Sequence, residues 1–264
     1  MISVHASWFG YEGLPFAECF RMAKQAGFDG VLLWWDDDNG ADFRDQPEMA
    51  RREDLWVENI HAPIDGLKHI WKDTAAGQVV FERYLGCADD CAAYEIPTMV
   101  MHVNSGASLW PMSKLGIERF KRIVERAEQK GVNVAVENLR SGDVKRVTVL
   151  LEQIDSPRFG FCFDSGHHYA WTPEINLLNR FGHRLMALHL HDNDGSADQH
   201  RLPFDGTIDW KTTMAAIAQT GYQNPTTLEV LARKPWYADM PPQEFLNKAY
   251  ERALKLDQLR NITI

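Results

Sequence analysis

Several features that define large classes of proteins are missing from this sequence. None of its apolar runs approaches the roughly 20 residues that a membrane helix needs, so we expect no membrane partner. The first residues, MISVHASWFGYEG, lack the basic and apolar regions of a secretory signal peptide. These absences lead us to expect a cytoplasmic protein.

Cysteine is also scarce. The four cysteines, Cys19, Cys87, Cys91 and Cys162, do not have the spacing of a zinc ribbon. Cys87 and Cys91 lie four residues apart within a helical pattern, which is typical of buried thiols. Both observations favour a reduced protein, in agreement with a cytoplasmic location.

The sequence also has fewer positively charged residues than negatively charged ones. The chain has 28 lysines and arginines against 37 aspartates and glutamates, which gives a formal net charge of -9. An acidic surface repels phosphate backbones, and this argues against nucleic acid as a partner. No GxGxxG motif follows the first predicted strand, which weakens a dinucleotide-binding interpretation.

Apolar strand-like segments and amphipathic helical segments alternate along the whole chain. The segments that predict strands are 2–8, 30–35, 56–63, 98–102, 132–138, 158–164, 184–191 and 226–230. Those that predict helices are 14–27, the region around PEMARREDL, 77–95, 113–131, 143–154, 173–182, 209–221 and 242–259. Continuous apolar strands alternating with helices imply a parallel sheet covered by helices. We therefore predict an α/β fold, a (β/α)8 TIM barrel forming a single domain over residues 1–264, with an open doubly wound sheet as the alternative.

Six consecutive predicted strands end in a residue that can bind a metal. These residues are His61, His102, Glu137, Asp164, His189 and Glu229. In a barrel the carboxyl ends of all strands lie on one rim, where active sites are built. Six such residues at equivalent positions favour one shared site over six separate buried polar residues.

The residue types at these ends indicate the chemistry. Histidine nitrogens and carboxylate oxygens without cysteine are typical of Zn²⁺, Mn²⁺, Co²⁺ or Fe²⁺ rather than Ca²⁺. The expected cofactor is such a divalent metal ion, or more than one. Carboxylates on two sides of a cation also suit proton transfer, because the cation stabilises an enediolate while one carboxylate removes a proton and the other returns one.

The order of short motifs at the strand ends resembles a known family. Along the chain the motifs are NIHAP, MHVNSG, VAVENL, FDSGHH, LHLHDND, DQH and TLEV. The ordered set spans about two thirds of the chain. It is similar to the xylose-isomerase-like TIM-barrel superfamily, which includes sugar isomerases, sugar-phosphate epimerases and apurinic endonuclease IV-like enzymes.

This resemblance implies a metal-dependent isomerase or epimerase whose substrate is a sugar, a sugar phosphate or a polyol. Carried over by position, the metal ligands are Glu137, Asp164, His189 and Glu229. Glu137 and Glu229 would be the catalytic acid–base pair. His167, in the Asp-x-x-His that begins at Asp164, would contact substrate.

The multi-zinc phosphodiesterase branch of the same superfamily matches further residues. Asp198 and His200 resemble an Asp-x-His that holds an additional zinc together with the residue matching His167, and His61 and His102 resemble another pair of ligands. Additional metals at these five positions therefore stay an open hypothesis. The segments VNS and NLR, which follow two of the strand ends, depart from that branch, and the acidic balance fits a small polyol better than DNA.

The remaining expectations concern the pocket and the alternatives. Trp8 or Trp34 is expected to form an aromatic floor for a sugar ring, and Arg201 to meet a charged group of the substrate. His191 is left out of the site because the loop after the seventh strand is expected to begin there. A keto-polyol dehydratase would use the same residues. A non-catalytic sugar-binding barrel is a further hypothesis, against which the intact acid–base pair argues. The oligomeric state is open, with a homodimer as the candidate.

Overall fold

Eight parallel strands form the centre of the protein. A computed structural model describes residues 1–6, 11, 13–36, 42–106, 110–232 and 235–262. The strands lie in one sheet in the order β7-β6-β5-β4-β3-β2-β1-β8. Their bounds are β1 Ile2–His5, β2 Gly30–Trp34, β3 Trp56–His61, β4 Thr98–Met101, β5 Asn133–Glu137, β6 Phe159–Asp164, β7 Leu185–His189 and β8 Thr226–Leu228. Each strand therefore neighbours the next one along the chain, as in the predicted barrel.

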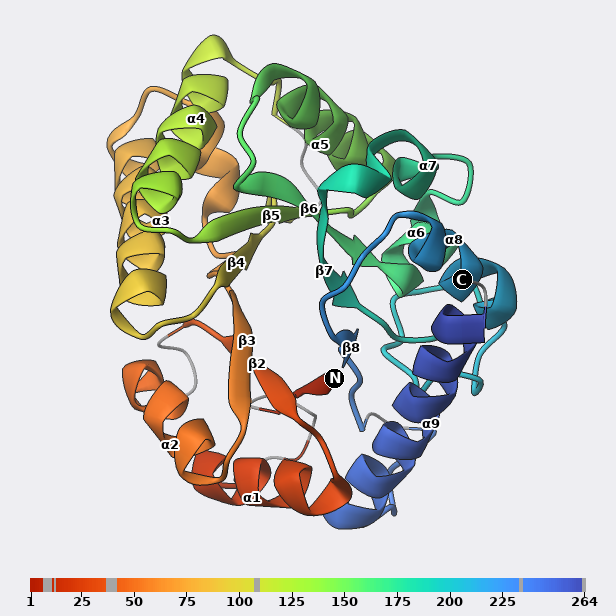
Figure 1. Cartoon of the computed structure of the whole chain (residues 1–264). Helices are drawn as coiled ribbons and strands as arrows, with labels where there is room; N and C mark the ends of the chain where they lie inside the picture. Colours follow the sequence, from red (N-terminus) through yellow and green to blue (C-terminus); the bar gives the residue numbers. More distant parts are fainter. Residues whose placement is uncertain (7–10, 12, 37–41, 107–109, 233–234, 263–264) are drawn as a thin grey trace.

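The sheet closes on itself beyond the end of β7. Leu190 donates its amide to the carbonyl of Thr227 (2.9 Å), and Glu229 donates its amide to the carbonyl of Leu190 (3.1 Å). This bridge makes the sheet a nearly closed barrel, with the helices in a ring around it (Figure 1). It also brings the end of β8 next to the end of β7, so Glu229 lies beside His189.

The helices follow from amphipathic segments with local caps. In α4 (Lys114–Gln129) the Ser113 side chain accepts the amide of Gly116, and Phe120, Ile123 and Ala127 are buried at helical spacing. The other α-helices are α1 Phe16–Ala26, α2 Gln46–Arg52, α3 Ala75–Ala93, α5 Ser141–Gln153, α6 Ser165–Trp171, α7 Leu177–Phe181, α8 Trp210–Gln219 and α9 Pro242–Ile262. Short 3-10 helices cover Phe43–Asp45, Leu67–Trp71 and Gly182–Arg184. No helix among the described residues is long and apolar enough to cross a membrane.

The predicted strands and helices are confirmed, with shifts of a few residues at their ends. From the Asp-x-x-His segment alone we expect a turn after Asp164, and the structure corrects this expectation: the segment is the helix α6. The Asp164 carboxylate accepts the amide of His167 at 2.6 Å and so acts as the N-cap of this helix. A strand therefore leads directly into a helix, which fixes His167 close to Asp164.

Two apolar clusters occupy the interior. The larger one lies between the strands and the surrounding helices. The smaller one consists of Val100, Ala135, Cys162 and Ala187. Each of these four residues precedes a strand-end residue by two positions, so it points to the same face of the sheet, the inside of the barrel. Small apolar side chains thus form the floor beneath the polar rim.

Glu58 is an acidic residue buried in the wall of this barrel. It lies at an irregularity in the register of β2 and β3, and its Oε2 accepts a hydrogen bond from Thr227 Oγ1 at 2.6 Å. Burial raises the pKa of Glu58 to about 7, although Thr227 and the nearby His189 act in the opposite direction. The folded protein therefore keeps a proton on Glu58 at pH values where the unfolded chain has lost it.

Because of this raised pKa, we expect the contribution of Glu58 to the free energy of unfolding to fall by about 3 kcal/mol as the pH increases from 4.5 to 7. The Glu58→Gln variant should lose that part of the pH dependence and be more stable than the wild type at pH 8. Urea unfolding at pH 5 and pH 8 measures the free energy of unfolding of both proteins. The exposed Glu48→Gln serves as the control, and a Glu58→Gln variant with the wild-type pH profile would contradict the prediction.

Candidate metal and acid–base site

The strand-end residues singled out in the sequence gather at the carboxyl ends of the barrel strands. His61, Glu137, Asp164 and His189 are the last residues of β3, β5, β6 and β7. His102 and Glu229 directly follow β4 and β8. All of these side chains except that of His102 are buried. The closed sheet therefore brings together residues that are up to 168 positions apart in the sequence.

Glu137, Asp164, His189 and Glu229 form a central group. One ligand atom from each of them lies within 4.8 Å of the others. His189 Nδ1 lies 3.2 Å from Glu137 Oε2 and 3.4 Å from Glu229 Oε2. The four residues predicted to share a metal therefore surround one small buried volume.

His61 and His102 lie on another side of Glu137. Their Nε2 atoms are 3.4 and 3.5 Å from Glu137 Oε2 and 3.2 Å from each other. His61 Nδ1 lies 3.0 Å from the carbonyl oxygen of Ala62. Because a carbonyl only accepts, this contact places the proton of a neutral ring on Nδ1 and leaves a lone pair on Nε2. Glu137 is thus the common member of two groups of ligands.

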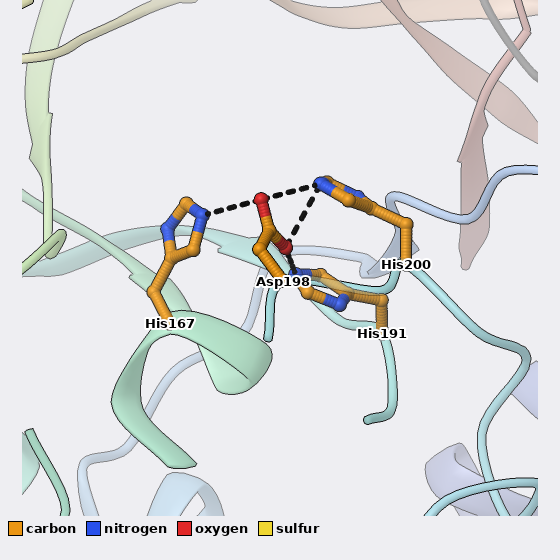
Figure 2. A group of neighbouring side chains, drawn as sticks. All are labelled: His167, His191, Asp198 and His200. Carbon is orange, nitrogen blue, oxygen red and sulfur yellow. Dashed lines mark hydrogen bonds and ion pairs between the residues drawn. The ribbon is translucent and has the colours of Figure 1, made fainter. Parts of the chain in front are cut away.

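A third group contains a histidine that the sequence analysis left out. His167, Asp198 and His200 come together as predicted, and His191 joins them (Figure 2). The sequence analysis left His191 out, whereas the structure places its Nε2 3.6 Å from Asp198 Oδ1. The two-residue spacing was the signal that pointed to it.

Side chains from neighbouring segments hold these groups in place. Asn138 donates Nδ2 to the carbonyl of Asp164 (2.9 Å) and accepts the amide of Asp164 on Oδ1 (2.8 Å). Ser165 Oγ donates to the carbonyl of His191 (2.8 Å) and accepts its amide (3.0 Å). These paired contacts join β5, β6 and the end of β7 directly below the ligands, which makes the rim a rigid frame.

The charges of the group shift its pKa values strongly. Burial raises the pKa of Glu137, but His102 and His189 lower it by more, so this pKa lies well below its usual value. Burial likewise raises the pKa of Glu229, and His189 outweighs it in the same way. Burial keeps the pKa of His102 below its usual value, so we assign His189, whose pKa is raised well above the usual value, as the main cationic partner of both glutamates.

The distances can be compared with those of a metal site. Ligand atoms about 2.0–2.2 Å from a tetrahedral zinc ion lie roughly 3.4 Å apart. The contacts of Glu137 with His61, His102 and His189 span 3.2 to 3.5 Å. The donor set of imidazoles and carboxylates is also the one that zinc, manganese, cobalt and iron prefer. The residues present therefore fit a divalent transition-metal ion.

The residues expected to contact substrate lie around these groups. Trp34 stacks on His61, with ring centroids 4.6 Å apart, and Trp171 stacks on His167 at 4.7 Å. The Arg201 guanidinium lies over the ring of Trp236, 5.1 Å from its centroid. Trp8 lies outside the described residues. Aromatic rings therefore lie next to two of the ligand groups, where they can cover a sugar ring.

The fold and these groups define a TIM barrel with a ligand-rich site at the carboxyl ends of its strands. The chain belongs to the xylose isomerase-like TIM barrel family, whose model matches residues 20–255. This result confirms the resemblance that the strand-end motifs suggested.

Individual proteins of this kind are similar along most of the chain. An uncharacterized protein, y4fM of Sinorhizobium fredii, is 27% identical over an alignment of 303 residues that covers 97% of this chain and 92% of the relative. The fructoselysine 3-epimerase of Shigella flexneri is 21% identical over 248 residues, covering 84% of this chain and 87% of the relative. The solved structure of the IOLI protein with a bound zinc atom has a TM-score of 0.77 at 15% identity, covering 100% of this chain and 99% of that one.

Proposed function

We propose that this protein is a divalent-metal-dependent isomerase or epimerase of a sugar or sugar derivative. The observation that carries the proposal is the convergence of Glu137 and Glu229 on His189, at 3.2 and 3.4 Å. Two carboxylates from different strands beside one cation site can supply both a base and an acid for proton transfer at carbon. The fructoselysine 3-epimerases among the relatives support this chemistry.

Four residues would hold the catalytic cation: Glu137, Asp164, His189 and Glu229. Bound there, it would supply positive charge next to the carbonyl oxygen of the substrate, on which negative charge develops during proton removal. His167 Nδ1 lies 3.0 Å from Glu137 Oε1 and 3.1 Å from the carbonyl oxygen of Asn138. His189 Nδ1 faces both glutamates.

The two glutamates would divide the proton transfer between them. One removes the proton from the carbon next to the carbonyl, and the other returns a proton, to the opposite face in an epimerisation. Both side chains are buried, and in these low-dielectric surroundings their charges interact strongly with a cation and with the substrate. Substrate contacts by His167, Trp34 and Arg201, a cytoplasmic location and a homodimeric assembly belong to the same proposal.

Solvent exchange of the substrate proton tests this function. The protein loaded with Zn²⁺, Mn²⁺, Co²⁺ or Fe²⁺ is incubated in D₂O with a panel of ketoses and ketose phosphates. We expect deuterium at the carbon next to the carbonyl of the accepted substrate, detected as loss of its proton NMR signal. Loss of water from that substrate would identify a dehydratase instead, and absence of exchange with every ion and sugar would contradict the proposal.

One observation supports phosphodiester hydrolysis as a second candidate. The mutual distances of His61, His102 and Glu137 are those of a further zinc site with an open position. An additional ion there would suit the charge of a phosphodiester and of an alkoxide leaving group. A bound ion that His61→Ala removes, together with cleavage of bis(p-nitrophenyl) phosphate, would support the hydrolase. Sugar exchange without either result would support the isomerase.

A further inference from the structure

Two lysines and a histidine surround the ring of Trp110, in the loops that follow β3 and β4. The Lys72 Nζ lies 3.7 Å from the centroid of this indole, and the Lys68 Nζ lies 5.5 Å from it. The imidazole of His69 meets the same ring nearly at a right angle, with centroids 4.9 Å apart. These four residues, called the Trp110 cluster below, gather three hydrogen-bond donors that can carry positive charge around one aromatic side chain.

The backbone that carries the cluster is held in place by buried side chains. Two of the cluster residues belong to the 3-10 helix Leu67–Trp71. The buried Trp71 donates its Nε1–H to the carbonyl of Val103 at 2.9 Å. The buried Arg119 donates Nη1–H to the carbonyl of Lys72 at 2.7 Å. Because these contacts already order the backbone, a ligand that binds to the cluster has less conformational freedom to remove.

The cluster lies close to the candidate catalytic site. Lys68 donates its amide to Ser105 Oγ at 3.1 Å, and Ser105 comes three residues after His102. Three residues of chain span at most about 10 Å. The side chain of His102 is 15% exposed, whereas that of its neighbour His61 is only 3% exposed. The ligand-rich site is therefore partly open to solvent at the strand end from which the loop of the cluster leaves.

The positive charge of the cluster is not matched by acidic side chains. Among the residues that the structure describes, the lysines in ion pairs are Lys130 with Asp89 and Lys255 with Glu251, and neither lysine of the cluster is one of them. The formal net charge of the chain is -9, so acidic partners are abundant elsewhere. Two unpaired ammonium groups around one ring therefore indicate a place for an anion from outside the protein.

We propose that Lys68, His69 and Lys72 bind the phosphate group of a phosphorylated ketose, so that the substrate is a sugar phosphate rather than a free sugar. A phosphate monoester carries a charge of about -1.5 to -2 at pH 7 and has three strong acceptor oxygens. The Trp110 ring holds the Lys72 ammonium by a cation–π contact and leaves its other N–H groups for these oxygens. This inference names the substrate of the proposed isomerase or epimerase and rests on that function.

Binding of inorganic phosphate to the metal-free protein tests the cluster without any reaction. A ³¹P NMR titration gives the dissociation constant. We expect Lys68→Gln and Lys72→Gln each to raise it about fivefold, and the double variant about 25-fold, because each removes one contact between opposite charges near the surface. Lys211→Gln, the same change at an exposed lysine of α8, should leave it at the wild-type value.

Deuterium exchange with the metal-loaded protein distinguishes the phosphate of a substrate from free phosphate. Ketose phosphates should be exchanged with a higher kcat/KM than the corresponding ketoses. The double variant Lys68→Gln/Lys72→Gln should lose this preference through a KM for the ketose phosphate that is about tenfold higher or more, with kcat close to the wild-type value. Lys211→Gln should keep the preference.

Three results would overturn the proposal. Wild-type phosphate binding in the double variant would show that the cluster is not an anion site. Loss of the preference in Arg201→Gln but not in the lysine variants would place the phosphate on Arg201, beside Trp236. Exchange of free ketoses as fast as their phosphates would exclude a sugar phosphate as the specific substrate. Absence of exchange with every sugar would instead contradict the proposed function, and the phosphate titration would still show whether the cluster binds an anion.

Discussion

Replacing Glu229 by glutamine is expected to reduce exchange of the substrate proton with solvent by about 10³-fold. Glutamine keeps the size of the side chain and an oxygen that can bind a cation, but it cannot accept a proton from carbon. The low pKa of the Glu229 carboxyl, which burial opposes and His189 more than compensates, keeps the wild-type group ionised and able to act as the base. Deuterium incorporation into the accepted ketose, measured by proton NMR at saturating metal, gives the rate.

The control separates loss of the base from loss of the metal. Metal content of Glu229→Gln is measured in the same samples, and the exposed Glu48→Gln serves as the matched glutamate change. A Glu229→Gln protein that binds its metal and still exchanges the proton at the wild-type rate would falsify the role of this residue. If the variant loses both the exchange and the ion, exchange is measured again with excess metal. Recovery of the exchange rate under that condition would assign Glu229 to metal binding alone.

The positions of the strand-end ligands could be predicted because two regular patterns fix them. Alternating strands and helices imply a barrel, and a barrel places the carboxyl ends of all its strands on one rim. Glu137, Asp164 and His189 could be predicted once the ends of their apolar strands were located in the sequence. Their convergence follows from the fold and does not depend on any loop.

The third ligand group does not follow from the strand and helix pattern alone. Asp198 and His200 lie between β7 and α8, in a segment whose path depends on turns rather than on a repeating pattern. His200 has a positive φ of 49°, a conformation that non-glycine residues rarely adopt. Its Nδ1 contact with the carbonyl of Glu229, 29 positions away in the sequence, accompanies this conformation. Such a long-range contact has no local sequence signal.

The loop that carries Asp198 and His200 is organised by a buried residue that sequence reasoning missed. The Asp192 carboxylate accepts the amides of Asn193 (2.9 Å), Phe204 (2.9 Å) and Ile208 (3.2 Å) and the Nε1–H of Trp210 (2.8 Å). Its backbone also pairs with that of Arg201 in both directions. One carboxylate thus satisfies four donors from both ends of the loop, which sets the path of the chain between β7 and α8.

Replacing Asp192 by alanine is therefore expected to lower the free energy of unfolding by about 4 kcal/mol or more. Each buried donor that loses its acceptor costs about 1–3 kcal/mol, and a charged acceptor makes the loss larger. Urea unfolding at constant metal concentration measures the effect. The control is Asp209→Ala, which removes the exposed N-cap of α8 that accepts the amide of Thr212, at an expected cost of about 1 kcal/mol.

A comparison of Asp192→Ala with Asp192→Asn tests whether Asp192 positions the candidate metal ligands of this loop. Asp192→Asn keeps one acceptor oxygen but sets an NH₂ group against amide donors, so its stability should lie between those of the wild type and Asp192→Ala. If the carboxylate positions Asp198 and His200, the affinity of the protein for Co²⁺ should fall in both variants, in the order of their loss of stability. An Asp192→Ala protein as stable as Asp209→Ala would show that the four donors find other acceptors, and that the loop holds its shape without this residue.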